Sequence, residues 1–500
     1  MRSTLLYIFS TVALLLCIQA CQSDDELITD SSAKLEFSVD TLRFDTVFTE
    51  LGSATKFIRV YNRHDNPINI SEIRLEAGDQ SFFRINVDGI PGDPATDIEV
   101  PANDSIYIFA EVTVDPDAPL SVSPFVITER LLFETNGNEQ QVTLEAWGQN
   151  ANYIPSRFSS GTFSLLSCDF GEITWDDPKP YVIYGILFID SCTLNIPAGT
   201  DVYVHGGVAL GDDGTGSNFA YNDGMLFVLP DGRLNITGTV DEPVVIQGDR
   251  LEEVFQEEPG QWAGIRLSSA DNTVEYAEVK NALYGFYVDS AAELSIKHSQ
   301  IHHTAGPALF GRHARIDAEN SLFYENAGQA VQLSYGGDYF FDYCTLANYG
   351  FDSPALRLSN GVCLDPLCTQ FLTNGITARF NNCIITGSRN DELVMSDFFG
   401  GTSFFDFNIQ FDHCIVQVKD MLDPTEGAYP NFFEDFTTDC INAVYGDTLF
   451  VSINENDYQL DTLSIAEEAA KVINGISLDL LNRARDATNP DIGCFEYQYE

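Results

Sequence analysis

The chain has 500 residues, and its 25 Lys and Arg against 75 Asp and Glu give a formal net charge of −50 at pH 7. A negative charge of this size repels phosphate backbones, so we expect no nucleic-acid partner. The hydrophobic content of 44% is sufficient for two or three domains with packed cores.

The chain begins with an export signal. Arg2 precedes an apolar run over residues 5–18 and small residues before Cys21. This run is too short for a membrane-spanning helix, so residues 1–20 are predicted to be a signal peptide. Ile18-Gln19-Ala20-Cys21 resembles a bacterial lipobox, with Gln19 where that motif has a small residue. The resemblance implies lipidation at Cys21 and a lipidated linker over residues 21–33.

An acidic run follows the lipobox at residues 23–26. It resembles the export tag that carries Bacteroidetes lipoproteins to the outer face of the outer membrane. The alternative interpretation is a solvated linker, the usual role of a short charge run. No other segment is long enough to span a bilayer, so the lipid is the expected attachment to the outer membrane, with the protein facing the cell exterior.

Residues 34–152 predict an immunoglobulin-like β-sandwich. Seven or eight short strands, including LEFSV, ATKFIRVYNR and SIYIFAEVTV, alternate with turn-rich pieces such as GIPGDPATD. This density of strands is typical of an antiparallel sandwich. The stretch over residues 45–75 resembles Hydin-like immunoglobulin-type modules of bacterial surface proteins, which implies a spacing or binding role.

The middle of the chain repeats. Aligned lines begin at Val274, Ile296, Ala318, Phe341, Phe380 and Phe411, so the spacing is 22, 22 and 23 residues and then 39 and 31 where loops are inserted. Each line alternates with a period of two, which indicates strands. A stack of such units predicts a parallel β-helix over residues 160–420.

Three further stretches extend this prediction. SCTLNIPAGTDVYV, DGRLNITGTVDEPVVIQGDR and GQWAGIRLSSADNTVEYAEV resemble the opening coils of right-handed, pectin-lyase-like β-helix proteins of Bacteroidetes, and the tail after residue 457 is similar to their closing segment. The overall fold class is therefore all-β, a β-sandwich followed by a right-handed solenoid. Helical character near residues 465–485 predicts that residues 421–500 cap the last coil.

One inward repeat position takes small residues. Ala277, Ser299 and Ser321 occupy it in the early coils, and Cys344, Cys383 and Cys414 in the later ones. A buried free thiol packs as a small hydrophobe, so we expect these cysteines to be core residues rather than metal ligands. Cys363 and Cys368, five residues apart in an inserted loop, are the expected disulfide.

The outward positions predict two charged columns along the β-helix axis. One reads Glu275, Lys297, Glu319, Asp342, Asn381, Asp412, and its neighbour reads Thr273, Ser295, Asp317, Phe340, Arg379, Gln410. Clustered carboxylates could hold Ca²⁺, the one cofactor the sequence suggests, and a nearby base could abstract a proton. If the protein is an enzyme, the candidate catalytic residues are Asp317, Glu319, Asp342, Arg379 and Lys297.

The pattern departs from known relatives of this fold. In pectate lyases carboxylates hold Ca²⁺ against an acidic sugar, and in β-helix glycosidases paired carboxylates serve as acid and base. The Gly-His-Gly and Arg-Ile-Lys signatures of polygalacturonases are absent. His205 precedes Gly206 but does not follow a Gly, and Arg315-Ile316 is followed by Asp317 instead of Lys. Charged residues on an outer face are most often only solvated. The sequence therefore favours a protein without catalytic activity.

Six Asp-Ser/Thr pairs each precede Ala or a larger aliphatic residue. They resemble the acceptor motif for O-glycosylation in exported Bacteroidetes proteins. The expected acceptors are Thr41, Thr46, Ser105, Ser290, Thr448 and Thr462.

The sequence supports three functions. The favoured one is a lipid-anchored surface protein whose β-helix binds a polysaccharide or another cell-surface partner without turning it over. The alternatives are a polysaccharide lyase or glycosidase acting on acidic polysaccharide, and a structural spacer or adhesin. The fold itself does not choose among them, because β-helices host all of these functions. The sequence does not indicate an oligomeric state.

Overall fold

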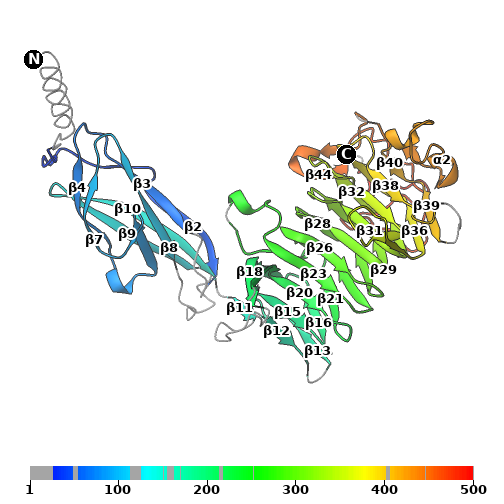
Figure 1. Ribbon diagram of the computed structural model, residues 1–500, viewed down its shortest axis with the longest axis horizontal. Coiled ribbons are helices and arrows are strands. Elements are labelled where there is room, and N and C mark those ends of the chain that lie inside the picture. Colours follow the sequence, from blue (N-terminus) through cyan, green and yellow to red (C-terminus); the bar gives the residue numbers. More distant parts are fainter. Residues whose placement is uncertain are drawn as a thin grey trace, which may run out of the picture. The chain divides into compact units, whose positions relative to one another are not determined.

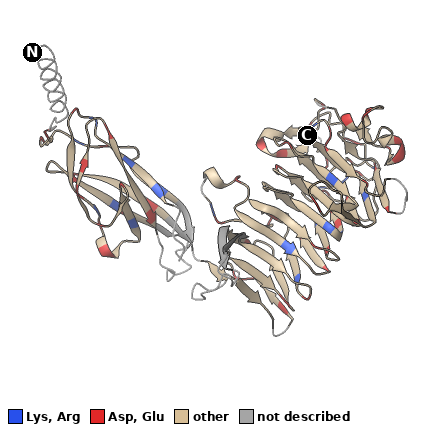
Figure 2. Cartoon of the chain, viewed as in Figure 1, with Lys and Arg blue, Asp and Glu red and all other residues tan. Residues whose placement is uncertain are grey.

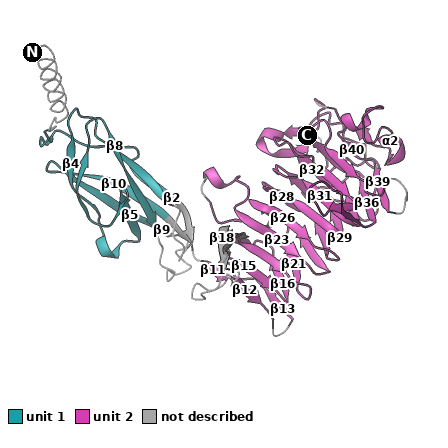
Figure 3. Ribbon diagram, in the orientation of Figure 1, with its two compact units in different colours: residues 1–150 teal, residues 151–500 magenta. Residues whose placement is uncertain are grey.

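The computed structural model describes residues 26–48, 55–112, 125–149, 151–154, 163–168, 171–212, 218–251, 253–400, 406–444 and 446–498. The chain divides into two compact units, Met1–Asn150 and Ala151–Glu500 (Figure 3). Nearly all regular structure is β, as Figure 1 shows. The predicted all-β fold class is confirmed.

The first unit is a sandwich of two five-stranded sheets. One sheet contains, in spatial order, β1 (Glu36–Phe37), β3 (Lys56–Tyr61), β8 (Ser105–Val112), β5 (Phe83–Val87) and β6 (Ile90–Pro91). The other contains β2 (Thr41–Phe48), β10 (Asn138–Gln149), β9 (Phe125–Thr135), β4 (Ile68–Leu75) and β7 (Ala95–Val100). Alternate residues of both sheets, such as Ile70 and Ile108, are fully buried between them.

One strand pair departs from the expected antiparallel pattern. β2 runs parallel to β10, with Thr41 opposite Thr143. The reason is a change of sheet: β1 belongs to one sheet, and the chain crosses to the other before Thr41. The first strand of the second sheet therefore lies beside the last strand of the unit and runs in the same direction.

The second unit is a β-helix with three faces. Each coil contributes strands to these faces, and the strands within a face run parallel. Face 1 contains β12 (Phe163–Leu166), β15 (Ile186–Ile189), β20 (Met225–Val228), β23 (Trp262–Leu267), β26 (Ala282–Val288), the first halves of β29 (Leu309–Glu319) and β31 (Val331–Asp342), β33 (Leu356–Ser359) and β38 (Leu393–Ser396). Face 2 contains β13 (Glu172–Thr174), β16 (Thr193–Pro197), β21 (Arg233–Thr237), β24 (Asn272–Glu275), β27 (Glu293–Lys297), the second halves of β29 and β31, β36 (Ile376–Asn381), β39 (Phe407–Asp412) and β41 (Thr437–Thr438).

Face 3 is a separate sheet of eleven strands. It contains β11 (Asn152–Ile154), β14 (Tyr181–Tyr184), β17 (Asp201–His205), β22 (Val244–Gly248), β25 (Ala277–Lys280), β28 (Gln300–His302), β30 (Leu322–Tyr324), β32 (Thr345–Asn348), β37 (Ile384–Gly387), β40 (Ile415–Val416) and β42 (Ile441–Asn442). Inward residues of all three faces form one continuous apolar core.

Short hairpins and helical turns make up the remaining elements. The hairpins are β18 (Gly207–Asp212) with β19 (Asn218–Asp223), β34 (Gly361–Cys363) with β35 (Phe371–Thr373), and β43 (Phe450–Ser452) with β44 (Asp457–Leu460). The helical elements are η2 (Gly78–Gln80), η4 (Glu253–Phe255), η5 (Asp420–Leu422), α2 (Phe432–Asp435) and η6 (Ile453–Glu455). Within the described part of the chain, no helix has the length and apolar character needed to cross a bilayer.

From β24 and β25 onward, a sharp corner joins face 2 to face 3 in each coil. At each of these corners one residue has a φ between +44° and +53°. From coil to coil these residues are Tyr276, His298, Asn320, Tyr343, Asn382, His413 and Asp439. The left-handed backbone costs about 1–2 kcal/mol for a residue with a Cβ. Hydrogen bonds from the next residue stabilise the turn: the Ser299 hydroxyl donates to the carbonyl of Lys297 and accepts the backbone N–H of Ala277 in the coil before.

The predicted inward column is confirmed at this corner. Ala277, Ser299, Ser321, Cys344, Cys383, Cys414 and Cys440 stack from coil to coil, and Cys440 extends the column beyond the expected range. The Cys414 sulfur accepts the N–H of Cys383, and the Cys440 sulfur accepts the N–H of Cys414. Cys344, Cys383 and Cys414 are fully buried free thiols. The thiols therefore fill the core and satisfy backbone donors.

Two disulfides are present among the described residues. Cys363–Cys368 is the expected pair. Cys168–Cys192, which the sequence did not single out, joins the start of the β-helix across 24 residues. Its two partners lie on loops of successive coils, so only knowledge of the coil boundaries would have brought them together.

The end of the β-helix is closed by residues 419–442. Met421 and Phe432 are buried against the last coils, and the Phe432 ring lies 5.5 Å from that of Phe411. The tail from Leu449 to Phe495 instead packs along the side of face 3, over outward residues that include Leu322, Ile384 and Ile415. The tail thus covers a flank of the solenoid.

The prediction of helix at residues 465–485 is wrong. The structure has turns, bends and an isolated bridge there. The tail follows the corner residues instead: Asn320 Nδ2 donates to the carbonyl of Leu478, and the Tyr343 hydroxyl donates to that of Lys471. Because the tail's backbone groups bond to the side of the solenoid, they do not need the internal hydrogen bonds of a helix.

Candidate functional site

The outward residues of face 1 form a column that is rich in aromatic side chains. Strand pairing places in register Leu165, Phe188, Phe227, Arg266, Tyr287, Phe310, Gln332, Arg357 and Val394. Their neighbours along each strand point into the core, as the period of two requires. Adjacent members are one strand spacing apart, about 4.8 Å.

The planar groups of this column contact one another in sequence. The ring centroids of Phe188 and Phe227 are 5.5 Å apart, and those of Tyr287 and Phe310 are 4.6 Å apart, edge to face. The Arg266 guanidinium lies between these pairs, 4.8 Å from the Phe227 centroid and 5.2 Å from that of Tyr287. All five side chains remain partly exposed. We name this set the aromatic column.

Arg266 is held in place by a polar pair beside the aromatic column. Its Nε donates to Asp289 at 2.7 Å, and the Ser268 hydroxyl donates to the same oxygen at 2.7 Å. Burial lowers the pKa of the guanidinium, but the hydrogen bond and charge of Asp289 outweigh burial, so the pKa of Arg266 is raised. The pair fixes a positive charge within a row of aromatic rings.

The sequence contains a signal for the aromatic column that the repeat alignment did not use. Each member lies between two buried residues along its strand, as in the triplets LFI, IRL and LFG. Such runs look like continuous core, and a fully apolar triplet hides which residue points outward. Only the strand register identifies the exposed one.

The two columns predicted from the sequence lie on face 2, and their register is confirmed. Glu275, Lys297, Glu319, Asp342, Asn381 and Asp412 are successive partners, as are Thr273, Ser295, Asp317, Phe340, Arg379 and Gln410. Figure 2 shows Lys and Arg on strands along the length of the β-helix. The predicted neighbours are therefore brought together.

Several charges of this group are paired. The Arg315 guanidinium donates to Asp317 through Nε at 3.0 Å and Nη2 at 3.1 Å. Lys297 Nζ donates to Glu319 at 2.9 Å. Both pairs are partly exposed, which makes each of them weakly stabilising. Arg379 is exposed and is two rungs from Asp317, with Phe340 between them.

Asp342 and Glu319 are the part of the predicted cluster with acid–base character. Burial raises the pKa of Asp342, and the charge of Glu319 on the adjacent rung raises it further, although Asn381 donates to Asp342 at 2.7 Å. A general acid requires a carboxyl whose pKa is raised, and within this cluster Asp342 meets that requirement. Lys471 of the tail contacts Asn381 and Asp412 on the next rungs.

No described residues form a group of three or more His, Cys, Asp or Glu that could hold a metal ion. This holds for the carboxylates that the sequence offered for Ca²⁺. Asp317 and Glu319 are engaged by Arg315 and Lys297, which leaves fewer free oxygens than Ca²⁺ takes.

A buried polar network lies on face 3. The Nδ1 atoms of His302 and His303 are 2.6 Å apart, so one carries a proton and the other accepts it. His302 Nε2 lies 3.2 Å from Glu278, and the His302 ring stacks on Tyr324 at 4.5 Å. Burial lowers the pKa of His303 to about 3. Burial also lowers the pKa of His302, so both buried imidazoles favour the neutral form.

The first unit has an exposed aromatic surface of its own. On its β3–β8 face, Phe57 is 5.5 Å from Tyr107, and the Arg59 guanidinium lies 4.8 Å from the Tyr107 ring centroid. A cavity of about 710 Å³ lies beside it, with Phe109 in its wall. This surface is a second place where a partner could dock.

The expected modification sites differ in accessibility. Cys21 lies outside the described residues. Ser290, Thr448 and Thr462 are exposed, and Thr41 and Ser105 are partly exposed. Thr46 lies in β2, and its side chain is among those not described.

One comparison, with a protein-family model, supports the β-helix fold. A family model described as a right handed beta helix region matches residues 245–415. The structure is similar to the catalytic unit of a GH87 alpha-1,3-glucanase from Streptomyces thermodiastaticus strain HF3-3, with 9% identity and a TM-score of 0.23, over 72% of this chain and 79% of that one. No curated protein matched.

Two further similarities cover shorter parts. A family 123 glycoside hydrolase from Clostridium perfringens matches with 11% identity and a TM-score of 0.16, over 23% of this chain and 26% of that one. A protein of unknown function from Porphyromonas gingivalis W83 matches with 12% identity and a TM-score of 0.18, over 28% and 57%. The chain thus spans about a quarter and just over half of these two structures. At these scores the similarities support no statement about activity.

Proposed function

We propose that this protein is a lipid-anchored cell-surface protein that binds an extended glycan along face 1 without turning it over. The observation that carries the proposal is the aromatic column, a row of partly exposed rings and a fixed guanidinium on a rigid sheet. In a soluble monomer an exposed apolar row of this length marks an interaction surface.

The chemistry of the aromatic column suits a sugar chain. The C–H faces of sugar rings are apolar and pack on aromatic rings, while their hydroxyls need donors and acceptors. Arg266 and Asp289 supply both within the row. Because the members repeat at about 4.8 Å along a straight axis, the surface presents equivalent contacts to successive residues of a polymer. A compact ligand would use only one or two of them.

A binding assay with matched variants tests this proposal. Tyr287→Ala and Phe227→Ala each remove one ring from the column, and we expect binding on a glycan array to weaken by roughly tenfold. Phe340→Ala removes a partly exposed ring from face 2, and Tyr107→Ala removes one from the first unit; neither should change binding. Equal losses in all four variants would contradict a site on face 1.

A product assay decides between binding and catalysis. The enzyme alternative rests on Asp342 and Glu319, and it predicts new unsaturated ends or reducing sugars from an acidic polysaccharide, lost in Asp342→Asn. Binding without product supports our proposal. Neither binding nor product would support the spacer or adhesin role.

The lipid anchor and the glycosylation are tested by mass. We expect protein from the native host to carry a lipid that Cys21→Ala abolishes, together with hexose increments that disappear when the acceptor hydroxyls are removed. A native mass equal to the unmodified polypeptide after signal removal would contradict both. The measurement is independent of the glycan assay.

A further inference from the structure

The strands of face 1 differ in charge from the rest of the molecule. The nine strands described for this face contain no Asp or Glu, and their only charged residues are Arg266, Arg312 and Arg357. The strands of face 2 contain eight acidic residues, which are Glu172, Glu275, Glu293, Asp317, Glu319, Asp338, Asp342 and Asp412. The whole chain has 75 acidic residues against 25 basic ones. Face 1 is therefore a positively charged sheet surface on an acidic protein.

The three arginines are evenly spaced along the β-helix axis. Arg266 and Arg357 belong to the same outward register, with the strands of Tyr287, Phe310 and Gln332 between them. Arg312 lies on the middle strand of this series, at the next outward position after Phe310. Successive arginines are thus two strand spacings apart along the axis, or about 10 Å. This interval is close to the length of a disaccharide in an extended polysaccharide.

The guanidinium groups of these arginines remain accessible to a ligand. The side chain of Arg266 is 38% exposed although it is paired with Asp289. Within the described part of the chain, no carboxylate pairs with Arg312 or Arg357, and the Nε of Arg357 has no hydrogen-bond partner. A guanidinium donates two parallel hydrogen bonds to a carboxylate or a sulfate, which makes it a stronger partner for these groups than for a neutral hydroxyl.

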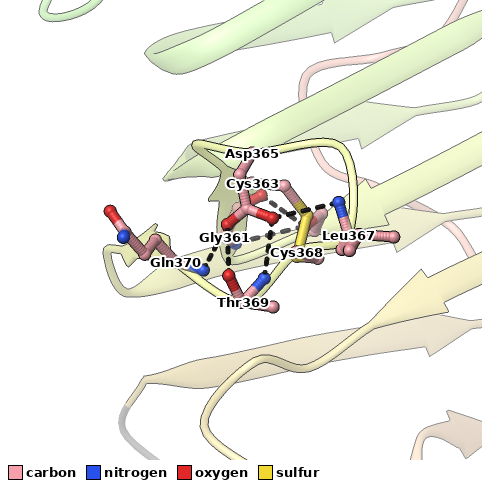
Figure 4. Close-up of a disulfide and its surroundings, with 8 residues drawn as sticks. Gly361, Cys363, Asp365, Leu367, Cys368, Thr369 and Gln370 are labelled. Carbon is pink, nitrogen blue, oxygen red and sulfur yellow. Dashed lines mark hydrogen bonds between the residues drawn. A yellow bond between two sulfur atoms is a disulfide. The ribbon is translucent and has the colours of Figure 1, made fainter.

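The hairpin that follows Arg357 does not neutralise it. β34 and β35 pair antiparallel, and the Cys363–Cys368 disulfide closes the loop between them (Figure 4). Asp365 in this loop is the first acidic residue after Arg357 along the chain. Its carboxylate accepts three backbone N–H groups of its own loop. The negative charge is thus held within the hairpin, and the positive charge of Arg357 is left for a ligand.

We propose that the glycan bound by face 1 is an anionic chain in which acidic sugars alternate with neutral ones. This inference rests on the proposed function and names the class of its ligand. The acidic groups bind Arg266, Arg312 and Arg357, and the sugar faces pack on the rings of the aromatic column. A polymer charged at every residue, such as a nucleic acid, carries its charges more closely than the arginines are spaced and is repelled by the net charge of −50.

Pairs of polymers that differ only in charge test the proposal. Hyaluronan carries one carboxylate per disaccharide, and κ-carrageenan carries one sulfate per disaccharide. Carboxyl reduction of the first and desulfation of the second give neutral counterparts. We expect at least one charged polymer to bind roughly tenfold more tightly than its neutral counterpart in isothermal titration calorimetry. The polymer that binds more tightly identifies the acidic group as carboxylate or sulfate.

Substitution of the arginines tests the same contacts from the side of the protein. Arg312→Gln and Arg357→Gln should each weaken binding of the charged polymer roughly tenfold and leave binding of its neutral counterpart unchanged. Arg379→Gln is the matched control, because it removes the same charge from an exposed position on face 2. Tyr287→Ala should weaken binding of both polymers. Unchanged thermal unfolding shows that each variant is folded.

The outcomes separate this inference from the proposed function. Equal binding of charged and neutral polymers, lost in Tyr287→Ala, would overturn the inference and leave the glycan site on face 1 in place. Equal losses in Arg357→Gln and Arg379→Gln would also overturn it. Tighter binding of polygalacturonate or of a thymidine oligonucleotide would contradict the match in spacing. Binding of none of the charged polymers would remove the inference, while the glycan array still decides the proposed function.

Discussion

Face 1 and face 3 of the β-helix both carry apolar side chains on their outer side, yet their surroundings differ. On face 3, Leu322, Ile384 and Ile415 are buried under the tail. On face 1, the rings of Tyr287 and Phe310 remain partly exposed. The outward apolar residues of face 3 are thus covered by the same chain, whereas those of face 1 remain open at the surface where we propose that a ligand binds.

Replacing one outward apolar residue by Asp on each face tests this difference most directly. Leu322→Asp places an unpaired charge under the tail, and we expect it to lower the free energy of unfolding by about 4 kcal/mol or more. Phe310→Asp changes a partly exposed position and should cost no more than about 1 kcal/mol. Urea unfolding measures both. Equal costs would mean that face 1 is as covered as face 3.

The second prediction concerns the attachment of the tail. Arg485 is almost fully buried, donates to Glu496 and to Asn320, and lies 3.9 Å from the Tyr343 ring centroid. Arg485→Ala leaves the Glu496 carboxylate without its cation, and we expect a loss of about 3–5 kcal/mol.

Two measurements check the Arg485 prediction. Urea unfolding gives the loss of stability, and binding of a hydrophobic dye reports exposure of face 3. Arg315→Ala is the control, because it removes an exposed pair with Asp317 and should cost at most about 1 kcal/mol. A destabilised variant that binds no more dye would show that the tail stays on face 3 without Arg485.

The third prediction concerns the loop that leads back to face 1. Glu392 is fully buried and accepts the backbone N–H groups of Ala355 and Arg389. Burial raises the pKa of Glu392 to about 7, although these two donors and Arg389 favour the carboxylate. With a folded pKa above the unfolded value, the stability contribution is complete below about pH 4.5 and is lost as the pH rises through about 7.

Glu392→Gln should remove this slope. The wild-type chain should lose up to about 3 kcal/mol more than the variant between pH 4.5 and 8. Urea unfolding across this range measures the difference, and other titrating groups cancel because both proteins contain them. Parallel pH profiles would show that the pKa of Glu392 is not raised in the folded protein.

The sequence predicted the β-helix because its repeats carry their register in small residues. Ala277, Ser299 and Cys344 mark one corner, and once they are aligned every outward neighbour follows, including the pairing of Glu319 with Asp342. The period of two and the repeat length together determine which residues share a face. For this reason the sequence predicts the columns of face 2.

The aromatic column and the tail could not be predicted in the same way. Tyr287 and Phe310 sit between buried neighbours, so hydrophobicity alone does not separate them from the core. The tail's position depends on contacts between distant residues, such as Arg485 with Asn320, which no local pattern encodes. The tail packs on face 3 through contacts between residues far apart in the sequence, and the helix expected near residue 465 does not form.

The smallest expected effect lies inside the stack, where all faces share one core. Cys414 occupies a position that Ser299 and Ser321 fill in earlier coils, and its sulfur accepts the N–H of Cys383. Cys414→Ser keeps an acceptor there and should cost less than about 1 kcal/mol. Cys414→Val keeps the apolar volume but leaves that N–H unpaired, and it should cost about 1–3 kcal/mol. Thermal unfolding ranks the two, and a valine tolerated better than serine would show that the column stabilises the corner by packing alone.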